Sequence, residues 1–219
     1  MKTLSAEEFG NHAEKGALII DIRSPDLLKQ GFVKGSIALA SLEKFAEYLG
    51  FISRFDTSEG FAPILLVSEE EKTKAFADQA NKMGVQVVGV LSGGVAAWES
   101  AGQKIDIVID VEADELMMDI PYDDHLIVMD IRPAISFGNG HLKDSVNLPL
   151  TEMADPLRLA AIEESDNIYI VADSDEEAYL AATILKKQDI HNIRVVLGGW
   201  ESVKEQSKAE VVKDPGMLN

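Results

Sequence analysis

The sequence predicts an α/β fold made of two similar domains, each with a small and mainly parallel sheet. A first motif, Asp21-Ile22-Arg23, recurs as Asp130-Ile131-Arg132, and a glycine pair, Gly93-Gly94, recurs as Gly198-Gly199. Between these motifs, short apolar runs alternate with helical patterns, an order that favours βαβ units with parallel strands. Two copies of this length indicate two domains and not a solenoid, whose repeats are much shorter.

In the first half, Ser5 and Glu8 have the spacing of a capping box, which predicts a short helix ending near Gly16. Compact apolar runs typical of buried parallel strands cover residues 17–20, 63–67 and 87–91. Residues 72–83 predict a helix between the last two strands. Its expected apolar face consists of Ala75, Phe76, Ala80 and Met83.

The second half repeats this pattern. Strands are predicted at residues 126–129, 168–171 and 195–197, and a helix at residues 176–187. The predicted apolar face of that helix consists of Ala178, Ala181, Ala182 and Leu185. We therefore expect domains at residues 1–104 and 112–207, joined near residues 102–112. Residues 208–219 have the composition of a frayed tail.

The charge of the chain is strongly negative and uneven. The net charge is −18, of which residues 1–104 carry −3 and residues 105–219 carry −15. Nucleic acid and anionic membranes need a basic footprint, so neither is an expected partner. The acidic half has two interpretations: a solvated surface that aids solubility, or a docking surface for a basic partner.

The chain contains no cysteine, which excludes disulfides, thiolate metal sites and a catalytic thiol of its own. The residues after Met1 include no apolar run typical of a signal peptide. No run of about 18 apolar residues predicts a membrane span. A cytoplasmic location is therefore expected.

The run from Gly140 to Pro149 reads Gly-His-Leu-Lys-Asp-Ser-Val-Asn-Leu-Pro and follows the second Asp-Ile-Arg motif. With the glycine pairs, this order resembles the rhodanese-like family over nearly the whole chain. The first copy has Phe32 where the second has His141. The resemblance implies two three-layer αβα domains with the sulfurtransferase fold. It also implies a site in the loop after the second long strand, where active members carry a cysteine that transfers sulfane sulfur.

Both of these loops lack the cysteine. Ser68 takes its place in the first loop and Ala172 in the second. The residues that follow are mostly acidic: Glu69, Glu70, Glu71, Lys72 and Thr73 in the first loop, and Asp173, Ser174, Asp175, Glu176 and Glu177 in the second. Carboxylates repel the anionic sulfur donors that such a loop binds. The sequence therefore predicts two vestigial sites without catalytic residues.

Other chemistry at these loops is disfavoured. A serine nucleophile needs an adjacent base, and no motif links a histidine to Ser68. The acids of the second loop supply oxygens, but they lack the glycine and terminal glutamate of an EF-hand loop. Acids in the first turn of a helix stabilise it through the helix dipole and the free N–H groups. No metal and no cofactor are predicted.

The remaining family motifs have structural interpretations. Asp21 with Arg23, and Asp130 with Arg132, can form charge-assisted hydrogen bonds that fix the following loop. His141 can act as a base or ligand, but a histidine at a turn more often satisfies backbone groups. The glycine pairs permit a tight turn. Trp98 and Trp200 occupy different positions after these pairs, and both are predicted to be packing anchors.

The predicted function is that of a catalytically inactive tandem protein serving as a binding or structural module. Residues 31–38, 63–71 and 91–102 resemble the rhodanese part of bacterial proteins in which such domains follow a metallo-β-lactamase-fold hydrolase. That resemblance implies a metallo-hydrolase or a persulfide-handling enzyme of sulfur metabolism as the partner. The alternative is a sulfurtransferase-like enzyme with altered chemistry or with a thiol supplied by a partner.

Overall fold

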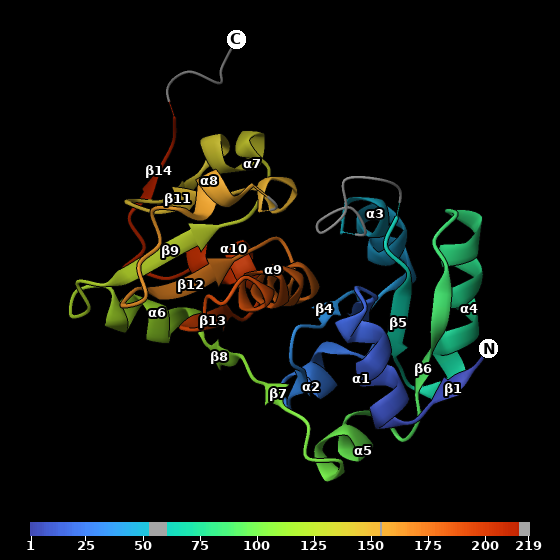
Figure 1. Cartoon of the computed structure of the whole chain (residues 1–219). Helices are drawn as coiled ribbons and strands as arrows, with labels where there is room; N and C mark the ends of the chain where they lie inside the picture. The colour runs from blue at the N-terminus through green and yellow to red at the C-terminus, as the bar shows by residue number, and fades with distance from the viewer. Residues whose placement is uncertain (53–60, 154, 215–219) are drawn as a thin grey trace. The chain divides into compact units, whose positions relative to one another are not determined.

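Each half of the chain forms a five-stranded parallel sheet with helices against its faces (Figure 1). The computed structural model describes residues 1–52, 61–153 and 155–214, apart from the side chains of Glu70 and Pro156. It divides the chain into two units, Met1–Ile107 and Val108–Asn219. The predicted α/β fold with two domains of parallel strands is confirmed.

The first unit has the strand order β1-β6-β5-β2-β4, and all neighbours in this order are parallel. Its elements are β1 (Thr3–Leu4), α1 (Ala6–Glu14), β2 (Leu18–Asp21), α2 (Pro25–Leu28), β3 (Phe32–Val33), β4 (Ile37–Ala38), α3 (Leu42–Ile52), β5 (Ile64–Val67), α4 (Glu70–Lys82), β6 (Val87–Leu91), α5 (Gly94–Ser100) and β7 (Ile105–Asp106). The predicted capping box at Ser5 and Glu8 is present at the start of α1.

Every residue of β2 and β5 is buried, because each strand packs against helices on both faces of the sheet. On one face, Ile19 and Leu65 join Phe9 of α1 and Trp98 of α5 in one apolar cluster. The helices α3 and α4 pack together through Phe45 and Phe76, whose rings meet edge to face at 5.0 Å. The core of this unit therefore lies on both faces of the sheet, because successive strand side chains point alternately toward one helix layer and the other.

The second unit repeats the topology with the order β11-β9-β12-β13-β8, again all parallel. Its elements are β8 (Ile109–Val111), α6 (Ala113–Asp119), β9 (Leu126–Asp130), α7 (Ala134–Asn139), β10 (His141–Leu142), β11 (Val146–Asn147), the 3-10 helix η1 (Leu150–Glu152), α8 (Pro156–Leu159), β12 (Asn167–Val171), α9 (Asp175–Lys187), β13 (Ile193–Val196), α10 (Gly199–Lys204) and β14 (Val211–Val212).

The helix α9 is buried more completely than its sequence pattern indicates. The predicted apolar residues are buried, but so are the residues between them, including Tyr179 and Thr183. Thr183 avoids an unsatisfied hydroxyl by donating to the carbonyls of Tyr179 and Leu180 at 3.0 and 2.9 Å.

In α4 the buried face is formed by Thr73, Phe76, Ala77 and Ala80. The expectation that Ala75 belongs to this face is wrong, because the i, i+3, i+4, i+7 stripe starts at Thr73.

A short antiparallel ladder closes each unit. In the first, β3 pairs with β7, and in the second, β10 pairs with β14. The expected frayed tail at residues 208–219 is therefore wrong for its described part, since Val211 and Val212 pair with Leu142 and His141. The remaining tail, residues 215–219, lies outside the described residues. Two paired residues are too few for a period-2 pattern, which is why the sequence does not indicate this strand.

No helix within residues 1–52, 61–153 and 155–214 is long and apolar enough to cross a membrane.

Candidate functional site

The Asp-x-Arg motifs end β2 and β9 and form the same contacts in both units. Arg23 Nε lies 2.9 and 3.0 Å from the two carboxylate oxygens of Asp21, and Arg23 Nη2 donates at 2.6 Å. Arg132 repeats this geometry on Asp130 at 2.9, 3.1 and 2.6 Å. Burial raises the pKa of the Asp21 carboxyl, and the hydrogen bonds and charge of Arg23 oppose this rise.

Each arginine also ties the strand end to the next short strand. Arg23 Nη2 donates to the carbonyl of Gly31 at 2.9 Å, and Arg132 Nη2 donates to that of Gly140 at 2.8 Å. The predicted charge-assisted bonds therefore form. They fix the loops that follow β2 and β9. These loops lie at the carboxyl edge of each sheet, where open α/β sheets bind their ligands.

The first loop, Ser68 to Thr73, runs from the end of β5 through the first turn of α4. The Ser68 hydroxyl donates to the carbonyl of Glu69 at 2.6 Å and lies 2.7 Å from the hydroxyl of Thr73. Glu69 is exposed and pairs with Lys72 at 3.7 Å. Glu71 is exposed, whereas the side chain of Glu70 lies outside the described residues. A carbonyl and a hydroxyl cannot serve as the base that a serine nucleophile needs.

The second loop, Ala172 to Glu177, runs from the end of β12 through the first turn of α9. Ala172 is fully buried, and Ser174 caps the helix by accepting from the backbone N–H of Glu177 at 3.3 Å. One Asp175 carboxylate oxygen accepts from the backbone N–H of Gly198 at 2.8 Å. The first turn of α9 also contains Glu176 and Glu177, and Asp173 is exposed before it. A carboxylate of the chain itself therefore binds a backbone donor at this site.

The glycine pair of the second unit closes against the same loop. The backbone N–H of Trp200 donates to the carbonyl of Ala172 at 2.8 Å. Gly198 and Gly199 have φ of 69° and 54°, a left-handed conformation that glycine adopts without strain. A Cβ on Gly199 would lie 2.1 Å from the Ala172 carbonyl oxygen. In the first unit, Gly93 and Gly94 have the same conformation, but a Cβ on Gly94 would meet open space.

His141 has a structural role in the second unit. Its Nδ1 lies 2.9 Å from the carbonyl of Phe137, and its ring stacks on the Phe137 ring at 3.7 Å. The residue is buried, and its backbone pairs with Val212 of β14. Within the described part of the chain, no three of the histidine, aspartate and glutamate side chains form a group that could hold a metal ion.

The two tryptophans occupy different environments. Trp98 is buried, meets Phe9 edge to face at 5.8 Å, and donates its Nε1–H to the carbonyl of Lys104 at 2.9 Å. Trp200 is partly buried and lies under the guanidinium of Arg132, whose central carbon is 4.3 Å from the ring centroid. Trp98 is therefore a core anchor, whereas Trp200 braces the Asp130–Arg132 pair.

Sequence reasoning missed the role of Asn147. Its side-chain amide donates to the carbonyls of Asp130 and Arg132, both at 2.9 Å, and so holds the turn at the end of β9. The only available signal was its place in the Gly140–Pro149 motif. The first copy has Ala38 at the matching position, so this brace belongs to the second unit alone.

The family model described as the rhodanese-like domain matches the chain twice, over residues 5–101 and 111–206. Among curated proteins, one match is "Putative sulfur carrier protein YrkF" of Bacillus subtilis (strain 168), 24% identical over 101 residues. The match covers 46% of this chain and 54% of that protein, so the matching segment spans about half the length of the curated relative.

Solved structures with a similar fold include sulfurtransferases. The thiosulfate sulfurtransferase of Pseudomonas aeruginosa is 13% identical, with 97% of this chain and 44% of that one covered and a TM-score of 0.39. The 3-mercaptopyruvate sulfurtransferase SseA of Escherichia coli is 17% identical, with coverages of 90% and 98% and a TM-score of 0.37. A rhodanese-like domain of Anabaena sp. is 17% identical, with coverages of 48% and 78% and a TM-score of 0.44.

Proposed function

The chain belongs to the rhodanese-like domain family, and we propose that it is a catalytically inactive member serving as a binding or structural module. It has no cysteine, so the sulfur-carrying nucleophile of the family is absent. The observation that carries the proposal is the hydrogen bond from the Gly198 N–H to the Asp175 carboxylate at 2.8 Å. A carboxylate of the chain already holds a backbone donor beside the loop where an anionic sulfur donor would have to bind.

Electrostatics support the same conclusion. The second loop carries four carboxylates, those of Asp173, Asp175, Glu176 and Glu177, without a basic residue between them. One contact between like charges at about 4 Å costs on the order of 4 kcal/mol at an effective dielectric constant near 20. Thiosulfate therefore meets an unfavourable potential as well as a missing thiol.

A sulfur-transfer assay from thiosulfate to a small acceptor tests the proposed inactivity. We expect no turnover above background from the unmodified chain. Turnover that is lost on Ser68→Ala would overturn the proposal and favour the alternative of a sulfurtransferase with altered chemistry. A thiol-bearing partner protein added to the same assay tests whether a thiol from elsewhere completes the site.

The variant Ala172→Cys asks whether the missing thiol is the sole obstacle. We expect this variant to stay inactive in the thiosulfate assay, because Asp175 still occupies the Gly198 N–H and the loop remains acidic. The matched variant Ala172→Cys with Asp175→Gly frees that donor, and any activity is expected there first. Full turnover by the single variant would show that the acidic loop is no barrier.

We also propose that the module works beside a metallo-β-lactamase-fold or persulfide-handling enzyme. Support comes from the sequence resemblance to the rhodanese part of such fusion proteins and from the sulfur-carrier name of the curated relative. The test is affinity purification of the tagged chain from its native lysate, followed by reconstitution with the purified candidate. A stoichiometric complex with a metallo-hydrolase or persulfide enzyme is the expected result. Failure of every such enzyme to bind would overturn this assignment.

A further inference from the structure

The amino-terminal edge of the second sheet lies opposite the edge that carries the second loop. Three connections reach this edge, because they immediately precede the parallel strands β9, β12 and β13. We name the surface formed by residues 118–124, 162–166 and 189–192 the amino-edge face. It is separate from the vestigial site, since the two ends of a parallel strand lie at opposite edges of a sheet.

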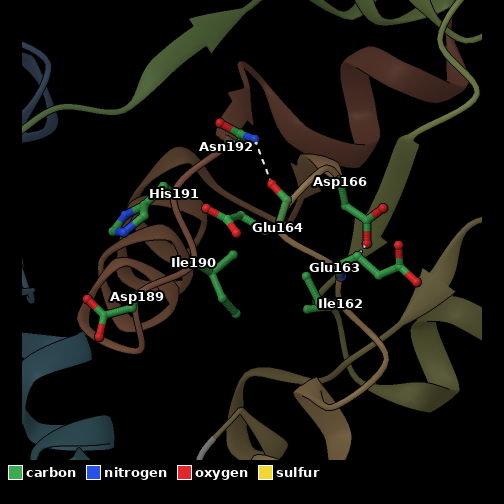
Figure 2. Close-up of a pocket in the computed structure, with 8 residues that line it drawn as sticks. All are labelled: Ile162, Glu163, Glu164, Asp166, Asp189, Ile190, His191 and Asn192. Atoms are coloured by element: carbon green, nitrogen blue, oxygen red, sulfur yellow. Dashed lines mark hydrogen bonds between the residues drawn. The ribbon is translucent and has the colours of Figure 1, made fainter.

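A hollow of about 500 Å³ opens in this face between residues 162–166, which precede β12, and residues 189–192, which precede β13. Figure 2 shows the side chains of Ile162 and Ile190 between the carboxylates that surround them. The lining carboxylates are Glu163, Glu164, Asp166 and Asp189. The hollow thus combines two half-buried isoleucines with four carboxylates, which we call the acidic rim.

The connection before β9, residues 118–124, carries apolar side chains that are exposed to solvent. Met118, Ile120 and Tyr122 are exposed by 50%, 39% and 89%. This segment is nevertheless held in place, because the Tyr169 hydroxyl donates to Asp119 at 2.6 Å and the Asn167 amide donates to Asp123 at 2.8 Å. Asn167 directly follows Asp166 of the hollow. The apolar segment and the acidic hollow therefore adjoin on one ordered surface.

Two cations near this face already have contacts within the fold. Lys186 donates to the carbonyl of His191 at 2.9 Å. Arg194 lies over the Tyr169 ring, 5.0 Å from its centroid, and donates to the Asn167 side chain at 3.3 Å. The histidines here, His125 and His191, are exposed. The carboxylates of three connections thus dominate the charge of the face.

We propose that the amino-edge face docks a partner protein through a segment that carries lysine or arginine side chains beside apolar ones. A long basic side chain can lay its aliphatic stem on Ile162 and Ile190 while its charged end meets the acidic rim. Tyr122 offers the exposed aromatic anchor that protein interfaces favour. Charge complementarity selects the partner and speeds its approach. The inference rests on the proposed function, since it names the surface and partner chemistry of the binding module.

The test is an NMR titration of the ¹⁵N-labelled full chain with a short amphipathic lysine–leucine peptide. We expect chemical-shift changes at residues 118–124, 162–166 and 189–192, and none at the second loop. Raising the salt concentration from about 0.1 M to about 1 M shortens the Debye length from about 10 Å to about 3 Å and should weaken binding strongly. A glutamate–leucine peptide of equal length serves as the control ligand.

Matched variants separate this surface from general attraction to an acidic protein. The triple variant Glu163→Gln, Glu164→Gln, Asp189→Asn should weaken peptide binding about tenfold, and Tyr122→Ala should weaken it severalfold. Asparagine tolerates the left-handed backbone of Asp189, whose φ is 61°. The control Glu99→Gln, Glu201→Gln, Glu205→Gln removes the same charge elsewhere and should leave binding within about twofold.

Equal weakening by both triple variants, or shift changes spread over the whole acidic half, would overturn the docking surface. Absence of peptide binding would do the same. Neither result touches the proposed inactivity, which the sulfur-transfer assay tests independently. Conversely, thiosulfate turnover with intact peptide binding would overturn the proposed inactivity and leave the docking surface standing.

Discussion

Arg132 and Arg23 show how a single side chain can organise a whole carboxyl edge. Each guanidinium neutralises a buried aspartate and reaches across to the carbonyl eight positions further along the chain. In the second unit, Trp200 covers the guanidinium and Asn147 holds the adjacent turn. These contacts hold the carboxyl edge of the second sheet together at a site that has no cysteine.

Removing the negative partner of this pair should be costly. Asp130→Asn leaves the Arg132 charge buried, with its side chain only 3% exposed, and without a counter-charge. We expect a loss of about 3 kcal/mol in the free energy of unfolding, the usual scale for breaking a buried ion pair. Urea unfolding followed by Trp200 fluorescence, with Trp98→Phe as the common background, measures it. The exposed Asp173→Asn is the control, and equal stability of the two variants would contradict the account.

Tyr169 gives the chain a pH dependence in the alkaline range. Burial, together with the hydrogen bond to Asp119, raises the pKa of Tyr169 to about 12. An unfolded tyrosine titrates near pH 10, so between about pH 10 and about pH 12 the folded state holds a proton that the unfolded chain has released. Stability is therefore lost as the pH rises through this window.

The measurement compares the free energy of unfolding against pH for the unmodified chain and for Tyr169→Phe. We expect the variant to lose less stability than the unmodified chain across this window. Tyr122→Phe, at a side chain that is 89% exposed, should keep the slope of the unmodified chain. Parallel curves for the unmodified chain and Tyr169→Phe would show that the phenol does not titrate differently on folding.

At the scale of elements, the sequence predicts long features and misses short ones. Continuous apolar runs identify β2, β5, β9 and β12, because a strand that is buried on both faces needs apolar residues at every position. The two-residue strands carry no such signal.

The Asp175–Gly198 hydrogen bond joins residues 23 positions apart and appears only once the strands are in place. The sequence indicates an acidic loop, but not which backbone donor an acid reaches.

The strand β14 illustrates what such a missed element contributes. It covers β10, and the backbone N–H groups of Lys143 and Asp214 donate to Glu210 and Gly138 at 2.8 and 3.0 Å. Truncation after Ser207 should therefore lower the free energy of unfolding of the second unit by about 1–3 kcal/mol, the scale of a few backbone hydrogen bonds.

Urea unfolding followed by Trp200 fluorescence, in a Trp98→Phe background, provides the measurement for this truncation. Glu210→Gln is the control, since it removes only the exposed pair with Lys143 and keeps the strand. We expect little change from it. An unchanged midpoint for the truncated chain would mean that β14 adds nothing to the unit.

For the whole molecule, the main asymmetry is charge. Two halves with the same topology carry net charges of −3 and −15, so the same fold is built with very different numbers of acidic residues. Like charges repel one another in the folded state more than in the expanded chain, because folding brings them closer. The second unit should therefore fold against a larger repulsion than the first.

Salt offers a way to measure that repulsion in one chain. Raising the salt concentration from about 0.1 M to about 1 M screens exposed charges, so it should stabilise the second unit more than the first. The chain has two tryptophans, one in each unit, so Trp98→Phe and Trp200→Phe variants report on one unit each. Each variant is compared with itself at the two salt concentrations, which cancels the cost of the substitution.

We expect a larger rise of the unfolding midpoint when Trp200 is the reporter. Equal rises would mean that the carboxylates of the second unit are already balanced locally, by helix N-termini and by contacts such as that of Asp175 with Gly198.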